Sequence, residues 1–497
     1  MGNLVYGLDS LQLVTTLVIL LRLIWAAARV PALWSKSKLS CIFKNKGSAR
    51  EAKNYRAISV TATLSRIFSQ IFLNRVRCAY NNMLGETQCG FRSGHGTDDA
   101  IWGLNQCLRK ASGTFYILFI DLTAAYDKIP RRHLFLCLVK RLKCNILLDI
   151  LRSIYTGTKA TIKGSKHEFD VGAGVRQGAL ESPIVFNIYF DFVLRVIRKR
   201  LVAELGLDFG LDFSFCIPNE VSTRDMRKRA KNRDSFRMFD ILYADDAAMF
   251  FRTKEALRKA VAIIHSELLR FGLILSLAKT ETMVVNGSPE DSSSKTYVTF
   301  QDIELKNTTE FKYLGLMTST TDEKKFLQHR IAAATSKFAS LRKLLTDRRI
   351  QLSTRTRFLS AFVRSRLTYS AATWNLNEAQ MSEIEAVWCR FLRRIVPGGF
   401  RRTADLHMLY SNDEIYKRTN VESIRTYLRK QQLRWIAHVC RMENDSFQKR
   451  LLFSSGKKYG RDIWIKLEQI SGIDRVQLRK IMMNRKEFFI WLASLTC

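Results

Sequence analysis

The sequence Phe239-Asp-Ile-Leu-Tyr-Ala-Asp-Asp-Ala-Ala-Met-Phe-Phe251 places two adjacent acidic residues, Asp245 and Asp246, between two short apolar runs. Apolar runs of this length favour β-strands, whereas Asp favours turns. The stretch therefore predicts a β-hairpin with the acidic pair at its tip. Taken alone, the pair is also compatible with an ordinary polar turn, so its meaning depends on what the rest of the chain supplies.

A third acidic residue, Asp121, directly follows the run Phe115-Tyr-Ile-Leu-Phe-Ile120. This run is bounded by Ser112-Gly113 and is a strand candidate in a mixed α/β core. A carboxylate at the end of a buried strand is held rigidly, as a metal ligand must be. The alternative is that Asp121 merely caps the strand or lies at the surface.

Neighbouring carboxylates repel one another unless a cation lies between them. Mg²⁺ prefers carboxylate oxygens together with substrate phosphates, so we expect a divalent metal at the acidic pair. If the fold brings Asp121 beside Asp245 and Asp246, the three acids would hold two ions. One ion would activate a 3′-hydroxyl and the other would support a pyrophosphate leaving group.

A glycine-bounded segment, Gly174-Val-Arg-Gln-Gly178, precedes Ser182-Pro183 and the apolar run at 184–190. Glycine lets the backbone approach a ligand closely, and Arg176 and Gln177 offer hydrogen-bond donors to a phosphate, sugar or base edge. By itself the segment is equally an ordinary turn before a helix.

Composition restricts the class of protein. The 497 residues are 47% hydrophobic and 11% aromatic, with only 6 Pro and 24 Gly, which excludes a disordered or collagen-like chain and suggests about three domains or subdomains. The 81 Lys and Arg exceed the 45 Asp and Glu by 36 charges, which favours a polyanionic partner such as a phosphate backbone. None of the ten cysteines forms a Cys-x-x-Cys pair, which indicates reduced thiols and argues against structural zinc.

The two ends of the chain have helical patterns. The apolar residues 11–21 and 23–25 are too few to span a bilayer and lack a basic leader, so we expect an amphipathic or buried helix that ends before Pro31, and no membrane association. The second half is predicted to be mainly helical and basic. Its first helix has one apolar face, formed by Phe326, Ile331, Ala334, Phe338, Leu341 and Leu345, with Lys325, Arg330, Lys337 and Arg342 elsewhere. We expect residues 219–237 to form either a basic solvated insertion or a binding loop. We expect residues 287–295 to form a plain loop.

These motifs, in this order, resemble the reverse transcriptase of non-LTR (LINE-type) retrotransposons. Asn54-Tyr-Arg-Ala-Ile-Ser59 resembles the finger motif Asn-Tyr-Arg-Pro-Ile-Ser, and Gln88-Cys-Gly-Phe-Arg92 resembles the Gln-x-Gly-Phe-Arg block. Residues 121–127, 174–183 and 243–246 match the palm motifs. Residues 277–281, 311–315 and 433–442 resemble the Lys-Thr motif, the primer-grip turn and a tail segment of one LINE branch. The resemblance runs from about residue 25 to about residue 445.

The resemblance implies an α/β (α+β) fold, namely a right-hand polymerase with fingers, palm and thumb, followed by a mainly helical basic C-terminal region. It places an N-terminal helical extension at 1–30, the reverse transcriptase domain of fingers and palm at 27–319, a helical thumb at 320–375 and the C-terminal region at 376–497. The implied activity is RNA-directed DNA polymerisation, in which a 3′-OH primer is extended on an RNA template. The implied partners are template RNA, primer or target DNA, and dNTPs, and no specific protein partner can be inferred.

The resemblance also assigns roles to residues. Asp121, Asp245 and Asp246 match the catalytic acids that bind two Mg²⁺ ions, for which Mn²⁺ is the alternative.

Four further residues match substrate contacts. Tyr126 matches the aromatic residue that closes the pocket against a 2′-hydroxyl and so favours deoxynucleotides. Gln177 matches the residue that contacts the sugar of the incoming nucleotide. Lys279 matches a basic residue near the nucleotide phosphates, and Arg56 is expected to reach the triphosphate from the fingers.

The sequence departs from the family pattern at three positions. Ala179 stands where Cys is usual, which is a small change, and His95 stands where a basic residue is frequent and is interpreted as a surface histidine. Glu181 stands where an apolar residue is usual, and an unpaired acid on a buried face would be costly. The alternative function is therefore a catalytically inactive or domesticated nucleic-acid-binding remnant of such a polymerase. An intron maturase ranks last, because residues 311–315 and the tail resemble LINE elements more closely.

Other segments common in these elements are not found. The first finger motif begins at residue 54, which leaves no room for a preceding endonuclease, and no Cys-Cys-His-Cys knuckle or ribonuclease H segment is evident. We therefore expect a polymerase module that is a truncated element copy, an incomplete gene model or a domesticated remnant. Priming on chromosomal DNA, as in the family, implies a nuclear location, with a cytoplasmic ribonucleoprotein as the alternative.

The large positive charge predicts the salt dependence of nucleic-acid binding. Lys and Arg that contact phosphates release counterions, so affinity for a primer–template duplex should fall steeply between about 50 and 200 mM salt. Fluorescence anisotropy at several salt concentrations measures this. A log–log slope near zero would exclude a phosphate-tracking surface.

Overall fold

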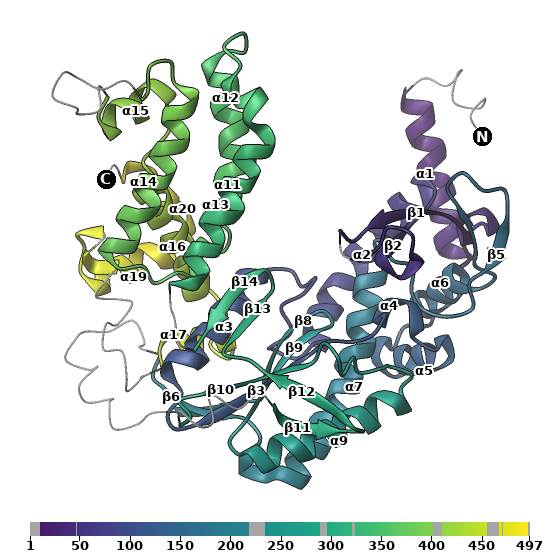
Figure 1. Ribbon diagram of the computed structural model, residues 1–497. Coiled ribbons are helices and arrows are strands. Elements are labelled where there is room, and N and C mark those ends of the chain that lie inside the picture. Colours follow the sequence, from purple (N-terminus) through teal and green to yellow (C-terminus); the bar gives the residue numbers. More distant parts are fainter. Residues whose placement is uncertain are drawn as a thin grey trace.

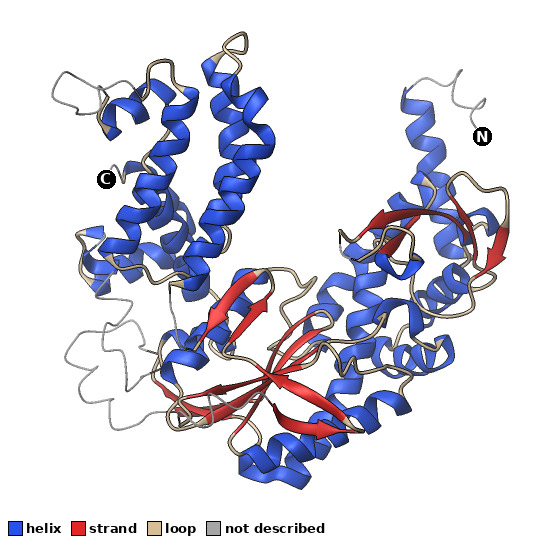
Figure 2. Ribbon diagram, viewed as in Figure 1, coloured by secondary structure: helices blue, strands red, loops and turns tan. Residues whose placement is uncertain are grey.

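The computed structural model describes residues 10–45, 47–217, 234–288, 296–320, 324–400, 410–454, 467–469 and 471–495. Most of the expected insertion at 219–237 and of the loop at 287–295 lies outside these residues, as do residues 1–9 of the N-terminal extension. Helices and strands are mixed in the first 320 residues, and helices dominate the remainder (Figure 2).

A six-stranded sheet lies at the centre of the molecule, in the order β11-β12-β10-β3-β9-β8. Its strands are β3 (Phe115–Ile120), β8 (Asp240–Tyr243), β9 (Asp246–Phe251), β10 (Glu281–Val285), β11 (Thr296–Phe300) and β12 (Ile303–Asn307). All neighbouring strands are antiparallel except β10 and β12. The predicted strand at 115–120 and the predicted hairpin are thus confirmed, although the first hairpin strand begins at Asp240 rather than at Phe239.

Strand β3 is apolar throughout because both faces of the sheet are covered. Alternate strand residues point to opposite faces. Tyr116, Leu118 and Ile120 join a core with helices α7 (Ser182–Leu205) and α9 (Lys254–Arg270). Phe115, Ile117 and Phe119 join a second core with α3 (Thr97–Lys110), α16 (Ile424–Cys440) and α17 (Phe447–Leu452). The second core also takes in residues of α19 (Arg475–Met483) and α20 (Arg485–Ser494), so the C-terminal region covers one face of the palm.

The six-stranded sheet is the palm, and the fingers stand on one side of it (Figure 1). The fingers contain a four-stranded sheet of order β2-β1-β4-β5, formed by β1 (Lys36–Phe43), β2 (Tyr55–Val60), β4 (Lys159–Ile162) and β5 (Glu168–Asp170). Helices surround it: α1 (Ser10–Ala26), α2 (Thr63–Met83), α4 (Ala125–Lys128), α5 (Arg131–Leu142) and α6 (Asn145–Tyr155). The expected N-terminal helix is α1, which ends before Pro31 as predicted. Among the residues described, no helix combines the length and apolarity needed to cross a membrane.

A helical module stands on the other side, joined to the palm by the hairpin β13 (Glu310–Tyr313) and β14 (Leu316–Ser319) (Figure 1). Its helices are α11 (Lys325–Thr346), α12 (Leu352–Phe358), α13 (Ser365–Leu367), α14 (Glu378–Ile395) and α15 (Asn412–Thr419). These helices share one core, which runs from Leu327 to Leu428. The division predicted at residue 375 therefore falls within a continuous core.

The apolar face predicted for α11 is buried at Ala334, Phe338 and Leu345, and Arg330, predicted to lie off this face, is buried as well. Arg330 is buried because its guanidinium donates to the Gly315 carbonyl (2.6 Å) and lies over the Tyr369 ring. It therefore fixes the helix to the turn between β13 and β14.

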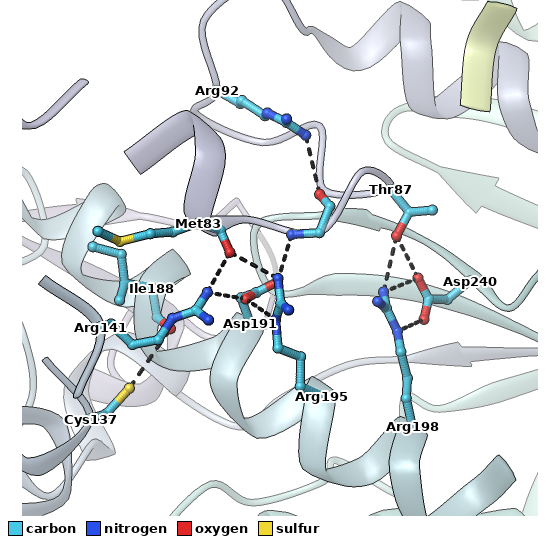
Figure 3. A network of polar contacts seen from close by, with 11 residues as sticks. Met83, Thr87, Arg92, Cys137, Arg141, Ile188, Asp191, Arg195, Arg198 and Asp240 are labelled. Carbon is cyan, nitrogen blue, oxygen red and sulfur yellow. Dashed lines mark hydrogen bonds and ion pairs between the residues drawn. The ribbon is translucent and has the colours of Figure 1, made fainter. Parts of the chain in front are cut away.

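Two buried acids fix helix α7, one to strand β8 before the acidic pair and the other to helix α5 and the loop after α2 (Figure 3). Asp240, the first residue of β8, is completely buried, forms a two-pronged ion pair with Arg198 of α7, and accepts a hydrogen bond from Thr87 (2.7 Å). Asp191 of α7 is 2% exposed and pairs with Arg141 and Arg195. Because buried carboxylates are costly unless they are paired, these contacts fix the elements that meet there.

Substituting Asp240→Ala should lower the free energy of unfolding by about 3–5 kcal/mol, because it leaves the mostly buried Arg198 without its carboxylate partner. The matched control is Asp212→Ala, which breaks the surface pair with Arg237 and should cost about 0–1 kcal/mol. Urea denaturation of the two variants tests this, and equal losses would contradict it.

Candidate active site

Strand register brings two of the three predicted acids together. The antiparallel pairing of β3 with β9 ends at Ile120↔Ala247. Continued by one residue, it sets Asp121 opposite Asp246. Residues directly opposite in an antiparallel pair have side chains on the same face, close enough to interact. Two acids that are distant in sequence therefore lie side by side at the end of the palm sheet.

On the other side of β3, the turn before β10 carries Lys279. The Ser276 N–H donates to the main-chain oxygen of Asp121 (2.9 Å), which ties this turn to the end of β3. The Lys279 Nζ then lies 3.0 Å from Asp121 Oδ1, while the Lys279 side chain remains 63% exposed. Lys279 is thus tethered to an acid of the site but still faces solvent.

The third acid, Asp245, lies in the two-residue turn that links β8 to β9. The other turn residue is Ala244, whose φ of +55° is in the left-handed region. A side chain with a Cβ adopts this conformation at a cost, so surrounding contacts must hold the turn. The predicted position of the acidic pair at the hairpin tip is confirmed, since Asp246 is the first residue of β9.

Burial and neighbouring charge raise the pKa values of the two hairpin acids. Burial, together with the charges of Asp245 and Asp121, raises the pKa of Asp246 to about 7, against a lowering effect of Lys279. Burial and Asp121 also raise the pKa of Asp245, while Arg56 and Lys279 oppose the shift. The nearby cations Lys279 and Arg56 therefore do not cancel the effect of burial and of neighbouring charge on the two hairpin acids.

This donor set fits a divalent cation that also takes ligands from substrate. In the described part of the chain, no three acidic, histidine or cysteine side chains form a metal-holding group by themselves. Mg²⁺ usually binds through one or two carboxylates and completes its coordination with phosphates and water. The mutual repulsion of Asp121, Asp245 and Asp246 is the observation that favours a cation among them.

Tyr126 of α4 forms one wall beside the acids. Its ring stacks on the buried Phe186 of α7, with centroids 4.5 Å apart and planes inclined by 11°. Burial raises the pKa of Tyr126, and the charge of Asp245 adds to this shift, so the phenol lies near the acidic turn. The stacked ring is rigidly held.

The segment 174–178 packs against the backbone of Tyr126. Gly174 has a φ of +71°, and a Cβ there would lie 2.5 Å from the Tyr126 carbonyl oxygen, so only glycine allows this approach. Gln177 is half-buried, and its carbonyl accepts a hydrogen bond from the N–H of Ser59 in β2 (2.7 Å). Gln177 therefore lies where the fingers strand meets the palm.

Arg56 belongs to the same fingers strand and is exposed. Its charge lowers the pKa of Asp245, which shows that the guanidinium lies close enough to act on the site. The structure thus brings the three acids, Tyr126 and Lys279 together, with Arg56 and Gln177 at the fingers border.

Arg176 was predicted to offer donors to a ligand, and this expectation is wrong. The side chain is 6% exposed and donates to the main-chain carbonyls of Trp34 (2.9 Å), Ser35 (3.4 Å) and Ile154. Burial lowers its pKa, and the nearby Glu181 opposes that shift. Glu181 is 2% exposed, and its charge interacts with the buried Arg176, so this acid is not without an electrostatic partner.

His95 is not a plain surface histidine. It is half-buried beside the C-terminal region, where its Nδ1 lies 3.0 Å from Gln448 Nε2. Burial and the charges of Arg92 and His438 lower its pKa to about 4. The His438 Nε2 lies 2.9 Å from the Gly94 carbonyl oxygen, so the finger block and the tail segment, which were recognised as separate motifs, pack together.

Gln88 was recognised as part of a motif but not as a functional residue. It is completely buried and bonds to the main chain of Ala244, between Tyr243 and Asp245. A Gln two residues before Gly90 was the available signal, although its partner could not be identified from sequence spacing.

A palm sheet with three acids at the end of its central strands, flanked by fingers and a helical module, defines a right-hand nucleic-acid polymerase. The family model described as "Reverse transcriptase (RNA-dependent DNA polymerase)" matches residues 42–318, which is more than half of the sequence. The chain belongs to this family.

Its relatives include proteins of non-LTR retrotransposable elements, as the motifs predicted. The chain is 26% identical over 286 residues to the Pol polyprotein of the type-2 retrotransposable element R2DM of Drosophila melanogaster, covering 55% of this chain and 24% of that protein. It is 23% identical over 276 residues to the R2 polyprotein of Nasonia vitripennis, covering 53% of this chain and 24% of that protein. The chain thus spans about a quarter of the length of these relatives.

Among solved structures, apo telomerase of Candida tropicalis is similar, with 15% identity, a TM-score of 0.42, and coverage of 94% of this chain and 69% of that one.

The raised pKa of Asp246 predicts a pH-dependent gain in stability for Asp246→Asn. In the folded protein Asp246 keeps its proton up to about pH 7, whereas an ordinary Asp, with a pKa of 3.8, loses it at lower pH. Wild-type stability therefore falls as the pH rises through this window. The variant should unfold at a higher temperature than the wild type at pH 8, and this advantage should vanish towards pH 4.

Thermal unfolding followed by circular dichroism across this pH range measures the difference. Added Mg²⁺ at pH 8 should narrow it, because an ion that binds the folded wild type stabilises it. A difference that does not change with pH would contradict the prediction.

Proposed function

We propose that the protein is an RNA-directed DNA polymerase that extends the 3′-hydroxyl of a DNA primer on an RNA template with dNTPs. The observation that carries this proposal is the juxtaposition of Asp121 and Asp246 across β3 and β9, with Asp245 in the adjoining turn and the pKa values of both hairpin acids raised. Such a cluster is poised to bind cations together with a triphosphate.

Asp121, Asp245 and Asp246 would hold two Mg²⁺ ions, or Mn²⁺ in their place. Bound there, the ions would lower the pKa of the primer hydroxyl and neutralise charge on the departing pyrophosphate. The role of the protein is to hold the three carboxylates in place before substrate arrives, so that little reorganisation is needed during the reaction.

Lys279 and Arg56 would supply the remaining positive charge. Lys279 can exchange its pairing with Asp121 for a phosphate oxygen of the incoming nucleotide, because its side chain is largely exposed. Arg56 would approach the triphosphate from the fingers side, as its effect on Asp245 indicates. The two cations would then orient the nucleotide between fingers and palm.

Tyr126 and Gln177 would select and orient the sugar. The Tyr126 ring is fixed by its stack on Phe186, so it cannot move aside for a 2′-hydroxyl, and deoxynucleotides would be favoured. Gln177 lies at the junction of fingers and palm, where its side chain can reach a sugar oxygen.

The template and primer would be bound through their backbones by the excess of 36 positive charges. Priming on a chromosomal DNA target would place the activity in the nucleus. The alternative of an inactive nucleic-acid-binding remnant rested on Glu181, and the proximity of Arg176 weakens it.

Primer extension tests the proposal. Purified protein should extend a DNA primer annealed to an RNA template when Mg²⁺ and dNTPs are present, and should extend poorly with ribonucleotides. Asp245→Asn should abolish extension because a carboxylate of the site is lost. The matched control is Asp212→Asn, which neutralises an exposed acid of β6 (Leu211–Phe215) outside the site and should remain active.

Tight binding of primer–template without extension by the wild type would overturn the catalytic proposal and favour the inactive remnant. If Asp245→Asn still extends the primer, Asp245 is excluded as a catalytic acid.

A further inference from the structure

One buried side chain bonds to both main-chain polar groups of the residue that precedes the acidic pair. Gln88 Oε1 accepts the N–H of Ala244 (2.9 Å), and Gln88 Nε2 donates to the Ala244 carbonyl (3.2 Å). The same Oε1 also accepts the N–H of Gly90 (2.9 Å). Gln88 is completely buried, so these bonds do not compete with solvent.

The turn requires such support because Ala244 adopts a left-handed backbone with a φ of +55°. Glycine adopts this conformation freely, whereas alanine does so at a cost. Residues 85–90, called here the supporting loop, carry Gln88. Gly90 allows this loop to approach the turn closely, since a Cβ at Gly90 would lie 2.3 Å from the Ala244 nitrogen. The sequence therefore places the glycine in the supporting loop rather than in the turn itself.

The supporting loop is anchored along strand β8. The Cys89 N–H donates to the Leu242 carbonyl (2.9 Å), and the Leu242 N–H donates to the Thr87 carbonyl (3.0 Å). These two bonds flank Gln88 and set it beside the hairpin that ends in Ala244.

Side-chain contacts anchor the same loop to helix α7 (Figure 3). Thr87 bonds to the buried pair of Arg198 and Asp240, and the Gly85 N–H donates to Asp191 (2.8 Å). The position of Gln88 is thus determined by bonds to β8 and by buried contacts with α7, independently of the turn at Ala244.

We propose that Gln88 is a positioning residue for the acidic pair. By holding Ala244 in its left-handed conformation, it fixes the direction in which Asp245 and Asp246 leave the turn relative to Asp121. Gln88 acts through the backbone of Ala244 and not on substrate. This inference rests on the proposed polymerase function and adds a residue that determines how well its acids are aligned.

A set of variants separates positioning from general stability. Gln88→Met has nearly the same volume but loses all three hydrogen bonds. It should lower kcat about 10- to 100-fold, as expected when the support of a metal ligand is removed, and raise the Mg²⁺ concentration at half-maximal rate. The dissociation constant for primer–template should not change. The matched control is Gln432→Met, another buried glutamine, which donates to the Trp374 carbonyl (2.7 Å).

A second substitution tests the mechanism directly. Ala244→Gly should restore most of the kcat lost in Gln88→Met, because glycine adopts a positive φ without support. Gln88→Glu, which keeps the two acceptor contacts and loses the donor, should fold and show a smaller loss of kcat. If Gln88→Met fails to fold, the activity of Gln88→Glu decides whether Gln88 positions the acidic pair.

Hydrogen exchange at the hairpin supplies a readout that is independent of catalysis. Without nucleic acid or metal, the Ala244 amide should exchange faster in Gln88→Met than in the wild type. In the control Gln432→Met it should exchange at the wild-type rate. If the wild type shows no extension, the proposed function fails, and this exchange measurement still tests the positioning.

The inference would be overturned by unchanged amide exchange, by full activity of Gln88→Glu, or by an equal loss of kcat in Gln432→Met. Failure of Ala244→Gly to restore activity to Gln88→Met would also overturn it.

Discussion

Like charges at the ends of β3 and β9 repel one another, and the rest of the folded chain has to hold them together. Burial is the largest cause of the raised pKa values of Asp245 and Asp246, and the charges of the neighbouring acids raise them further. Register across the palm sheet fixes Asp121 opposite Asp246, and the surrounding apolar packing prevents the strands from moving apart. Lys279 and Arg56 reduce the repulsion only partly, because both are exposed. A cluster of this kind is unfavourable without a cation and favourable with one.

The elements that hold the acids form a hierarchy. Burial of both faces makes β3 the most constrained strand of the palm, and its neighbours take their register from it. Helix α7 supplies Phe186 beneath Tyr126 and Arg198 against the start of β8, so one helix steadies both a wall of the site and the hairpin. Because interiors are close-packed, a small displacement of α7 would be passed on to the turn.

Much of the palm could be predicted from sequence because its signals are local. Runs of apolar residues that end in Asp predict strands with acids at their ends, and 115–121 and 239–251 both behave in this way. The predictions were wrong where a side chain forms contacts with groups that are distant in the sequence. Arg176 binds carbonyls near residues 34 and 154, Arg330 binds one in the preceding hairpin, and His95 packs on the C-terminal region. A single sequence does not reveal such pairings, so Arg176 was assigned to a ligand and His95 to the surface. The role of Gln88 was missed for the same reason, since its partner lies in a motif more than 150 residues away.

The covering of the palm by C-terminal helices also bears on the order of synthesis. Lys110, at the end of α3, donates to the Leu451 carbonyl at a separation of 341 residues, and the core beneath includes residues as late as Leu492. At a ribosomal rate of about 5–20 residues per second, roughly 20–70 s pass between the emergence of these two segments. During that interval one face of the emerging palm lacks the C-terminal helices that cover it, so part of its apolar surface is exposed to chaperones or to other nascent chains. The core of the palm is therefore completed only after residues as late as Leu492 have been synthesised.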